Sequence, residues 1–274
     1  MVLKSFSKIN LSLNINSKLK NGLHDIQSYY CLINLFDKIK IRKIDKKKDK
    51  VVFFGPFVKH IKKSNNSITN LLKLLRKLEL ISGYYSVNVI KNIPVFSGLG
   101  GGTSNAASVL KFLLKGKVSK NILEKVEKLI GSDLRLFFHK QGFLQNLRTI
   151  KTIKKQKLFF LLSRPNIICS TKKIYSKVKK FTKAKFYSIS NNLFSVKFLK
   201  KMKNDLEKIA LNEHPKLRIL KNFLENLSNI EFVRMTGSGS AIIAYFSSAK
   251  KCKEAEKKVK KQFRNYWCKT SKTI

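Results

Sequence analysis

The stretch PVFSGLGGGTSNAA, residues 94–107, most restricts how this chain can fold, because it gathers four of the 12 glycines within residues 98–102. Ordering glycine costs more backbone entropy than ordering any other residue. Such a cluster therefore indicates a sharp bend or a close approach to a ligand. Residues 84–92 alternate like a strand, and the pattern after the glycines predicts a helix over about residues 103–115.

The start of this helix is suited to an anion. Three residue types that cap helices follow the last glycine: Thr103, Ser104 and Asn105. A helix N-terminus presents unpaired N–H groups and partial positive charge, and glycines let these groups approach a phosphate closely. The stretch therefore predicts a phosphate cradle, with a tight strand-to-helix connection as the alternative.

Two common phosphate motifs do not fit. A Walker loop ends in Gly-Lys-Ser/Thr, whereas here Thr103 directly follows Gly102. The dinucleotide fingerprint requires a further glycine at position 103 and an acid closing the next strand, whereas Glu124 lies in an amphipathic segment. The loop therefore belongs to another class.

Composition indicates a folded, intracellular chain. Hydrophobic residues make up 43% of 274, enough for one large or two modest domains. We find no apolar run of about 18 residues and no signal-peptide pattern in MVLKSFSKINLSLNI, so we expect a cytoplasmic protein without a membrane span. The four cysteines are widely spaced without a C-x-x-C pair, which favours reduced packing residues and no metal site.

The formal charge of +44 has two interpretations. A basic surface suits a nucleic-acid binder, because lysines release counterions from phosphate backbones. However, the lysine clusters are spread along the whole chain, and lysine greatly outnumbers arginine, the better reader of phosphates and bases. We therefore favour a compositional bias with nonspecific anion affinity and expect no specific nucleic-acid partner. The clusters lie at 38–50, 151–157, 172–186, 195–203 and 250–261.

The remaining pattern predicts an α+β fold with mainly antiparallel sheets. Strands are expected at 1–16, 39–44, 51–54, 84–92, 229–235 and 241–246, and extended segments at 134–147 and 158–165. Helices are expected at 65–82, 103–115, 119–130, 171–181 and 249–264. The lysine run at 150–157 is the predicted domain boundary.

The glycine stretch resembles the ATP-binding motif of the GHMP kinases, which include galactokinase and the homoserine, mevalonate and phosphomevalonate kinases. Other stretches of this chain resemble further motifs of that family, in the same order, over roughly residues 3–250. These are SKINLSLNI, NGLHDIQS, NSITNLLKLL, GSDLRLFF, NDLE and MTGSGSAIIAYF. The set is specific, although NDLE or GSG alone would be weak.

The resemblance implies a two-domain GHMP kinase fold. Residues 1–152 would form a ribosomal-protein-like domain with the ATP loop, and residues 153–274 a ferredoxin-like domain. The motifs are most similar to the member that phosphorylates the 2-hydroxyl of a CDP-linked methylerythritol in non-mevalonate isoprenoid synthesis. ATP and Mg²⁺ would be the cofactors, and the protein a monomer or weak homodimer. A homoserine or mevalonate-type kinase and a basic RNA-associated protein remain alternatives.

The resemblance also assigns catalytic residues. Asp133 would accept or orient the proton of the attacking hydroxyl, and Lys8 would pair with it and compensate charge on the phosphoryl group. From sequence alone Asp133 is equally a turn aspartate before an apolar strand, and Lys8 is one lysine among many. The ATP loop would comprise Pro94, Val95, Phe96, Ser97, Gly98, Leu99, Gly100, Gly101, Gly102, Thr103 and Ser104.

Two further assignments concern the nucleotide. Thr103 or Ser104 could meet Mg²⁺ through a hydroxyl. Asn66 occupies the family position that starts a helix near the nucleotide, and a plain N-cap is its alternative.

A cytidine pocket is implied for the substrate. His24 would read the cytosine edge, Tyr175 would stack on the ring, and Asn10 would face the methylerythritol end. Gly237 and Gly239 would close the site from the second domain, unless they form a bare turn.

Three departures from the family pattern stand out. Leu23 replaces a tyrosine, so one aromatic face of the cytidine pocket is missing. Arg135 replaces a proline two residues after Asp133 and is expected to add a positive charge near the site. FLQNLRTI stands where the family has a Gly-x-Gly-Glu turn.

Overall fold

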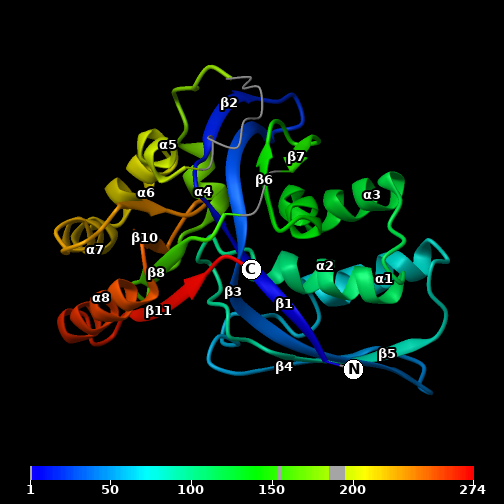
Figure 1. Ribbon diagram of the computed structural model, residues 1–274. Coiled ribbons are helices and arrows are strands. Elements are labelled where there is room, and N and C mark those ends of the chain that lie inside the picture. Colours follow the sequence, from blue (N-terminus) through cyan, green and yellow to red (C-terminus); the bar gives the residue numbers. More distant parts are fainter. Residues whose placement is uncertain (1, 153–155, 185–194) are drawn as a thin grey trace. The chain divides into compact units, whose positions relative to one another are not determined.

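The protein is described by a computed structural model that covers residues 2–152, 156–184 and 195–274 (Figure 1). The chain divides into two compact units, each built from several segments. The first unit comprises Met1–Lys8, Leu35–Val95 and Gly100–His139, and the second comprises Ile9–Asn34, Phe96–Leu99 and Lys140–Ile274. The predicted boundary at 152/153 touches residues 153–155, which lie outside the described residues, and it stays a prediction.

The first unit is built on a sheet of alternating apolar strands. Its strands are β1 (Val2–Asn10), β3 (His24–Ile44), β4 (Lys50–Phe54) and β5 (Tyr84–Ile90), of which β1 and β3 continue into the second unit. Residues 38–44 of β3 pair antiparallel with β5, and β4 runs parallel to β5. Ile39, Ile41, Val87 and Val89 are fully or almost fully buried, so alternate side chains form the core of this unit.

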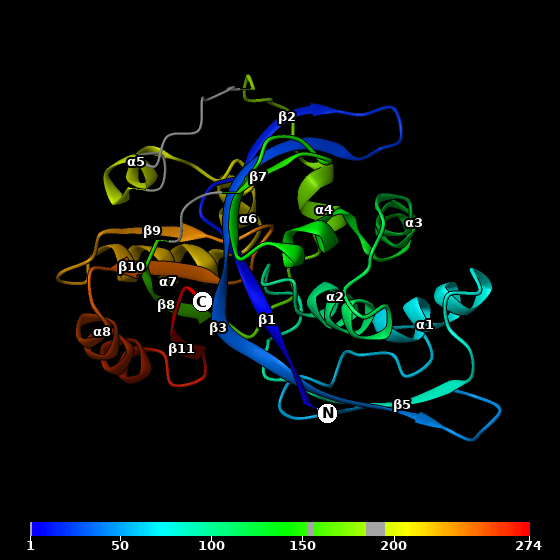
Figure 2. The same ribbon diagram turned by 45° about the vertical axis from the view of Figure 1, so that its right-hand side comes forward.

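Helices of the first unit lie on one side of strands β4 and β5 in both views (Figures 1 and 2). They are α1 (Ser67–Lys77), α2 (Gly101–Leu113), α3 (Lys120–Ile130) and the short 3₁₀ helix η1 (Ser132–Phe138). Helix α1 buries Ile68, Leu71, Leu72 and Leu75, as the sequence spacing predicts.

The second unit contains a four-stranded antiparallel sheet in the order β11-β8-β10-β9. Its strands are β8 (Phe159–Arg164), β9 (Phe232–Met235), β10 (Ile242–Phe246) and β11 (Trp267–Lys272). Helices α7 (Pro215–Glu225) and α8 (Ala249–Gln262) pack against this sheet (Figure 2). The chain order β8-α7-β9-β10-α8-β11 confirms the predicted ferredoxin-like arrangement.

Further short elements complete the second unit. They are β2 (Asn14–Lys18), β6 (Gln141–Leu144), β7 (Ile150–Thr152), α4 (Thr171–Ser176), α5 (Val196–Lys201) and α6 (Glu207–Glu213). Residues 24–31 of β3 pair antiparallel with β2 and β6, and β6 pairs with β7. The α+β class with mainly antiparallel pairing is confirmed.

Three expected elements are wrong in extent or type, and part of one strand was missed. The single strand over 1–16 is broken after Asn10, because the chain turns before β2 begins. Residues 132–138 form a 3₁₀ helix where an extended segment was expected, so their apolar run reflects burial on all sides. Helix α4 ends at Ser176. The pattern missed residues 24–38 of β3, whose near-continuous burial hides the alternation.

From the sequence we expect no membrane span and reduced cysteines, and the described residues bear on both points. In that part of the chain, no helix is both long and apolar enough to cross a membrane. All four cysteines lie there, buried and without a disulfide. Burial raises the pKa of the Cys169 thiol to about 11, which leaves it protonated and unreactive at neutral pH.

A buried arginine ties the ferredoxin-like sheet to two other segments of the second unit, the residue after β1 and the end of α5. Arg234, on β9, is 5% exposed. Its guanidinium donates to the carbonyl oxygens of Leu11 (2.5 Å), Leu199 (3.0 Å) and Met202. The carbonyls of Leu11 and Met202 lie just beyond the ends of β1 and α5, where the guanidinium supplies a donor, whereas that of Leu199 also accepts the N–H of Met202.

Replacing Arg234 by methionine should therefore lower the free energy of unfolding by about 2–4 kcal/mol, because three carbonyls lose a charged donor while the apolar stem is kept. Urea denaturation measures this change. Lys216→Met, at an exposed position of α7, is the control and should stay within about 0.5 kcal/mol of the parent. Equal midpoints for the two variants would contradict the role of Arg234.

Candidate active site

Lys8 and Asp133 form an ion pair in the first unit. Lys8 comes from β1 and Asp133 from the first turn of η1, and Lys8 Nζ lies 3.0 Å from Asp133 Oδ2. The Lys8 side chain is 4% exposed, whereas that of Asp133 is 36% exposed. A buried ammonium requires a partner, which fixes the carboxylate in position. The carboxylate remains open to a second molecule.

Gly100 packs directly against this pair. Its φ is +68°, and a Cβ there would lie 2.8 Å from Phe137 Cζ and 3.3 Å from two atoms of the Lys8 stem. Only glycine fits both this backbone conformation and this space. Gly100 is also the N-cap of α2, and it has no side chain to occupy the N–H groups at the helix start.

Helix α2 begins earlier than predicted. It starts at Gly101, so Thr103, Ser104 and Asn105 lie inside the helix and do not cap it. Ser104 is buried, and its hydroxyl donates to the carbonyl oxygen of Phe6 at 2.6 Å. Thr103 is only half-buried. Of the two hydroxyls proposed for Mg²⁺, that of Thr103 is the more accessible.

The preceding part of the loop is anchored within the second unit. A Cβ on Gly98, whose φ is +74°, would lie 2.1 Å from the carbonyl oxygen of Thr236. A Cβ on Gly237 would lie 3.3 Å from Gly98. The Ser240 N–H donates to the carbonyl oxygen of Phe96 at 3.2 Å. Residues 96–99 therefore lie against the turn that carries the predicted Gly237 and Gly239.

Three aromatic rings gather in the second unit. The His24 ring, at the start of β3, lies 5.1 Å from that of Tyr175 on α4 and 6.4 Å from that of Phe181. Burial, with a smaller effect of the Lys18 charge, lowers the pKa of His24 from its ordinary value of 6.5. The imidazole is therefore neutral at pH 7 and can both donate and accept a hydrogen bond.

Sequence reasoning did not single out Phe181, whose ring lies beside that of His24. Its side chain is 48% exposed, and the neighbouring Thr182 is held by a backbone bond to Ile15 and a side-chain bond to Asp205. The aromatic residues within the lysine-rich stretch 179–187, of which 185–187 lie outside the described residues, were the available signal. Leu23 is 49% exposed and adds no ring.

Asn10 and Asn66 both serve a structural purpose. Asn10 is buried in the second unit, and its amide donates to Ser28 Oγ at 2.8 Å. Asn66 caps α1 by accepting hydrogen bonds from the N–H groups of Ile68 and Thr69. The adjacent Ser67, not singled out in the sequence, donates to the carbonyl oxygen of Gly102 at 2.8 Å. This bond ties the start of α1 to the glycine loop.

Arg135 does not add an isolated charge beside Asp133. Its guanidinium is buried and makes two hydrogen bonds to the carboxylate of Glu127 on α3, one of them 2.6 Å long. The positive charge is thus compensated within the first unit. The expectation of an added positive charge near Asp133 is therefore corrected: Arg135 is paired with Glu127.

Comparisons with known proteins agree with this arrangement. The family model described as GHMP kinases N terminal domain matches residues 66–134, and that described as GHMP kinases C terminal matches residues 194–265. A 4-diphosphocytidyl-2-C-methyl-D-erythritol kinase of Pelagibacter ubique (strain HTCC1062) is 45% identical, covering 99% of this chain and 98% of the relative. The enzyme of that name from Persephonella marina (strain DSM 14350 / EX-H1) is 33% identical, covering 89% and 90%.

Solved structures show the same fold. A crystal structure of 4-(cytidine 5'-diphospho)-2C-methyl-D-erythritol kinase matches with a TM-score of 0.76 and 20% identity, covering 99% of each chain. A homoserine kinase from Cytophaga hutchinsonii matches with a TM-score of 0.70 and 15% identity, covering 98% of this chain and 94% of that one. At these identities the matches establish the two-domain architecture alone.

The glycines of the loop should differ sharply in their tolerance of alanine. Gly98→Ala should lower the free energy of unfolding by about 2–4 kcal/mol, because the added methyl meets a backbone oxygen and φ is positive. Gly102→Ala should stay within about 1 kcal/mol of the parent, since its Cβ would lie 3.7 Å from Ser67 Oγ, an ordinary contact. Chemical denaturation of both variants tests this. Similar losses at both positions would show that the packing described here is wrong.

Proposed function

Because the chain belongs to the GHMP kinases, we propose that it transfers the γ-phosphoryl group of ATP to the 2-hydroxyl of 4-diphosphocytidyl-2-C-methyl-D-erythritol. The 45% identity over almost the whole chain supports this substrate. The observation that carries the chemistry is the Lys8–Asp133 pair, with its buried ammonium and accessible carboxylate.

Asp133 acts on the attacking hydroxyl. Its carboxylate accepts the hydroxyl proton, or a hydrogen bond from it, as the new O–P bond forms. Lys8 holds this carboxylate in place and adds a positive charge where the transferring phosphoryl group develops negative charge. Phosphoryl transfer depends mainly on such positioning and charge compensation, so this pair supplies the chemistry that the protein must provide.

The glycine loop binds the ATP phosphates in this proposal. The N-cap Gly100 has no side chain to bond the backbone N–H groups at the start of α2, which leaves these groups available to a phosphate. Mg²⁺ fits a site made from the phosphates and one protein hydroxyl, because magnesium usually keeps waters and takes few protein ligands. Thr103 would hold it. Bound Mg²⁺ neutralises charge on the phosphates.

His24, Tyr175 and Phe181 form the cytidine pocket. The neutral imidazole of His24 can accept the exocyclic N–H of cytosine, and the two rings beside it provide apolar faces for the base. Phe181 thereby supplies the aromatic face that Leu23 lacks. Asn10 would face the methylerythritol end of the substrate, and Gly237 and Gly239 would contribute substrate-binding backbone from the second domain.

Competing functions make different predictions for binding. A homoserine or mevalonate-type kinase would bind ATP but not cytidine nucleotides, so failure of CMP to compete with the substrate would favour it. An RNA-associated protein would bind RNA tightly at moderate salt and lack ATP affinity.

The oligomeric state expected from the family resemblance is a monomer or a weak homodimer. Light scattering would test this expectation.

Asp133→Asn should lower kcat for CDP-methylerythritol by about 10²–10⁴-fold, because an amide cannot accept the hydroxyl proton. Steady-state kinetics measures this, with ATP affinity determined on the same sample. Asp45→Asn, in the exposed turn after β3, is the control and should leave kcat unchanged. Full activity of Asp133→Asn would retain the substrate but reject the assigned base.

Phe181→Ala should raise KM for the cytidine substrate by about 5–100-fold, since stacking of a base on an aromatic ring contributes roughly 1–3 kcal/mol. KM for ATP should not change. Phe54→Ala removes an equally exposed phenylalanine from β4 and serves as the matched control. If both variants keep the parental KM, Phe181 lies outside the pocket.

A further inference from the structure

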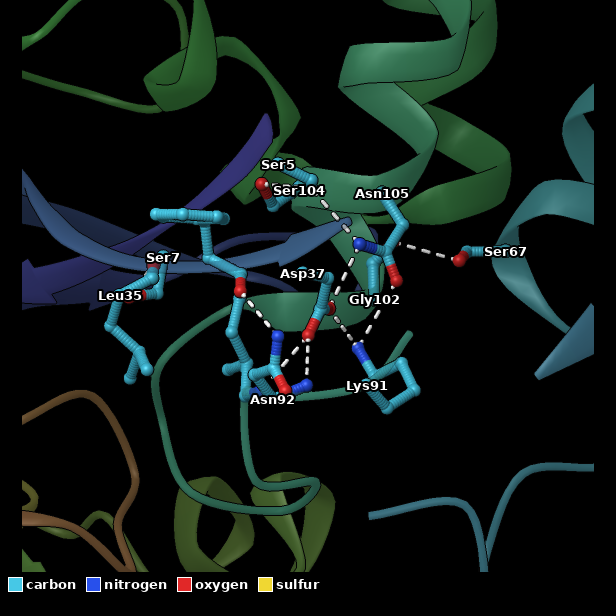
Figure 3. A network of polar contacts seen from close by, with 12 residues as sticks. Ser5, Ser7, Leu35, Asp37, Ser67, Lys91, Asn92, Gly102, Ser104 and Asn105 are labelled. Carbon is cyan, nitrogen blue, oxygen red and sulfur yellow. Dashed lines mark hydrogen bonds and ion pairs between the residues drawn. The ribbon is translucent and has the colours of Figure 1, made fainter. Parts of the chain in front are cut away.

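A fully buried carboxylate lies in the first unit, outside the Lys8–Asp133 pair. Asp37, on β3, is 0% exposed and accepts hydrogen bonds from four donors (Figure 3). They are the Lys91 ammonium, the Asn92 N–H (2.7 Å), the Ile93 N–H (2.9 Å) and the Asn105 amide (2.9 Å). Sequence reasoning did not single out this residue, which precedes the strand expected over residues 39–44.

The four donors come from the two ends of the glycine loop. Residues 91–93 directly follow β5 and lead into the loop, whereas Asn105 lies in the first turns of α2, after the loop. Both oxygens of Asp37 are used: Oδ1 holds the backbone before the loop, and Oδ2 holds Lys91 and Asn105. One carboxylate therefore joins the entrance of the loop to its exit.

Lys91 adds a second link between the same two segments. Its side chain is 2% exposed, and Nζ also donates to Asn105 Oδ1 at 3.1 Å. A Cβ on Gly101 would lie 3.3 Å from this nitrogen, so the ammonium sits against the first residue of α2. Burial lowers the pKa of Lys91, and the charge of Asp37 acts against this shift.

The network also reaches β1. The Asn105 amide donates to Ser5 Oγ at 2.9 Å, and Ser5 Oγ lies 2.7 Å from Ser104 Oγ. Ser5 precedes Lys8 on the same strand. The helix that follows the glycine loop is thus held to the strand that carries the catalytic lysine.

Stability alone gives little reason for such a network. A buried ion pair is often no more stabilising than apolar residues of the same volume, because both charges must leave water. Its directional hydrogen bonds do specify geometry, however. Glycine-rich backbone lacks the steric restriction that would otherwise define one conformation. Fixed ends reduce the entropy lost when the loop closes on a ligand.

We propose that Asp37 is a positioning residue for ATP: by binding Lys91, the backbone at residues 92–93 and Asn105 at once, it holds both ends of the glycine loop in the phosphate-binding conformation. This inference rests on the proposed function, because it requires that the loop binds ATP. Asp37 itself touches neither nucleotide nor substrate.

The test compares two cation-paired carboxylates of the first unit, the fully buried Asp37 and the partly buried Asp49. Asp37→Asn keeps the size and shape of the side chain but places an uncharged amide beside the Lys91 ammonium. Asp49→Asn is the matched control, since Asp49 also pairs with a cation, Arg76 (3.0 Å), and accepts a backbone N–H, that of Tyr85 (2.9 Å). Its partners lie at the end of α1 and the start of β5, away from the loop ends. Both variants should lose stability.

Isothermal titration calorimetry with ATP and, separately, with CMP gives the deciding measurement. Asp37→Asn should weaken ATP binding by about 10–100-fold, the loss expected when a binding group is misplaced by about 1 Å, and leave CMP binding unchanged. Asp49→Asn should leave both affinities unchanged. Asn105→Ala removes the link to α2 but keeps the Lys91–Asp37 pair, so it should weaken ATP binding by a smaller factor. If Asp37→Asn does not fold, the ATP and CMP affinities of Asn105→Ala provide the test.

The outcomes separate this inference from the proposed function. If the parent protein binds ATP and Asp37→Asn binds it equally well, or if Asp49→Asn weakens ATP binding as much, the positioning role is wrong and the kinase function stands. If the parent protein binds no ATP, both fall. Selective loss of ATP affinity in Asp37→Asn, with CMP binding intact, supports the inference.

Discussion

Close packing of the glycine loop against its own surroundings is the constraint on which the candidate site depends. Gly98 lies against the backbone at Thr236, and Gly100 lies against Lys8 and Phe137. A side chain at either position would displace the Thr236 backbone or the Lys8 and Phe137 side chains. The glycines therefore serve two purposes: they permit the positive φ values of the loop, and they let its backbone pack closely against Thr236 and the Lys8–Asp133 pair.

Scarce acids are used at selected places in this very basic chain. The chain has 59 lysines and arginines but only 15 aspartates and glutamates. Four acids of the first unit each hold a cation: Asp37, Asp49, Glu127 and Asp133. Because unpaired buried charges are strongly unfavourable, three of these acids provide the partners that Lys8, Lys91 and Arg135 need in the interior, whereas Arg234 of the second unit is held by carbonyl oxygens. The remaining basic residues are mostly exposed and fit a compositional bias.

Sequence reasoning worked best where the pattern is local. The strand before the glycine loop and the helix after it were predicted, as were the buried face of α1 and the final helix α8. Local patterns failed where burial is complete, as in the first half of β3 and in η1, because alternation disappears when every side chain is inside. The start of α2 was also misplaced, since Gly100, and not a polar side chain, ends the loop.

The sequence by itself determined which chemistry is possible: a glycine loop, a lysine and an aspartate in motifs that resemble those of one kinase family. Only the tertiary structure decided which groups meet. Asp37 and Lys91 are 54 residues apart, and Asp37 and Asn105 are 68 apart, so no local pattern reports their contact. The same holds for the ring of Phe181 beside His24 and for the pairing of Arg135 with Glu127. The physical reason is that helix and strand periodicity follow from short-range sterics and burial, whereas charge pairing and ring contacts depend on where the whole chain places each element.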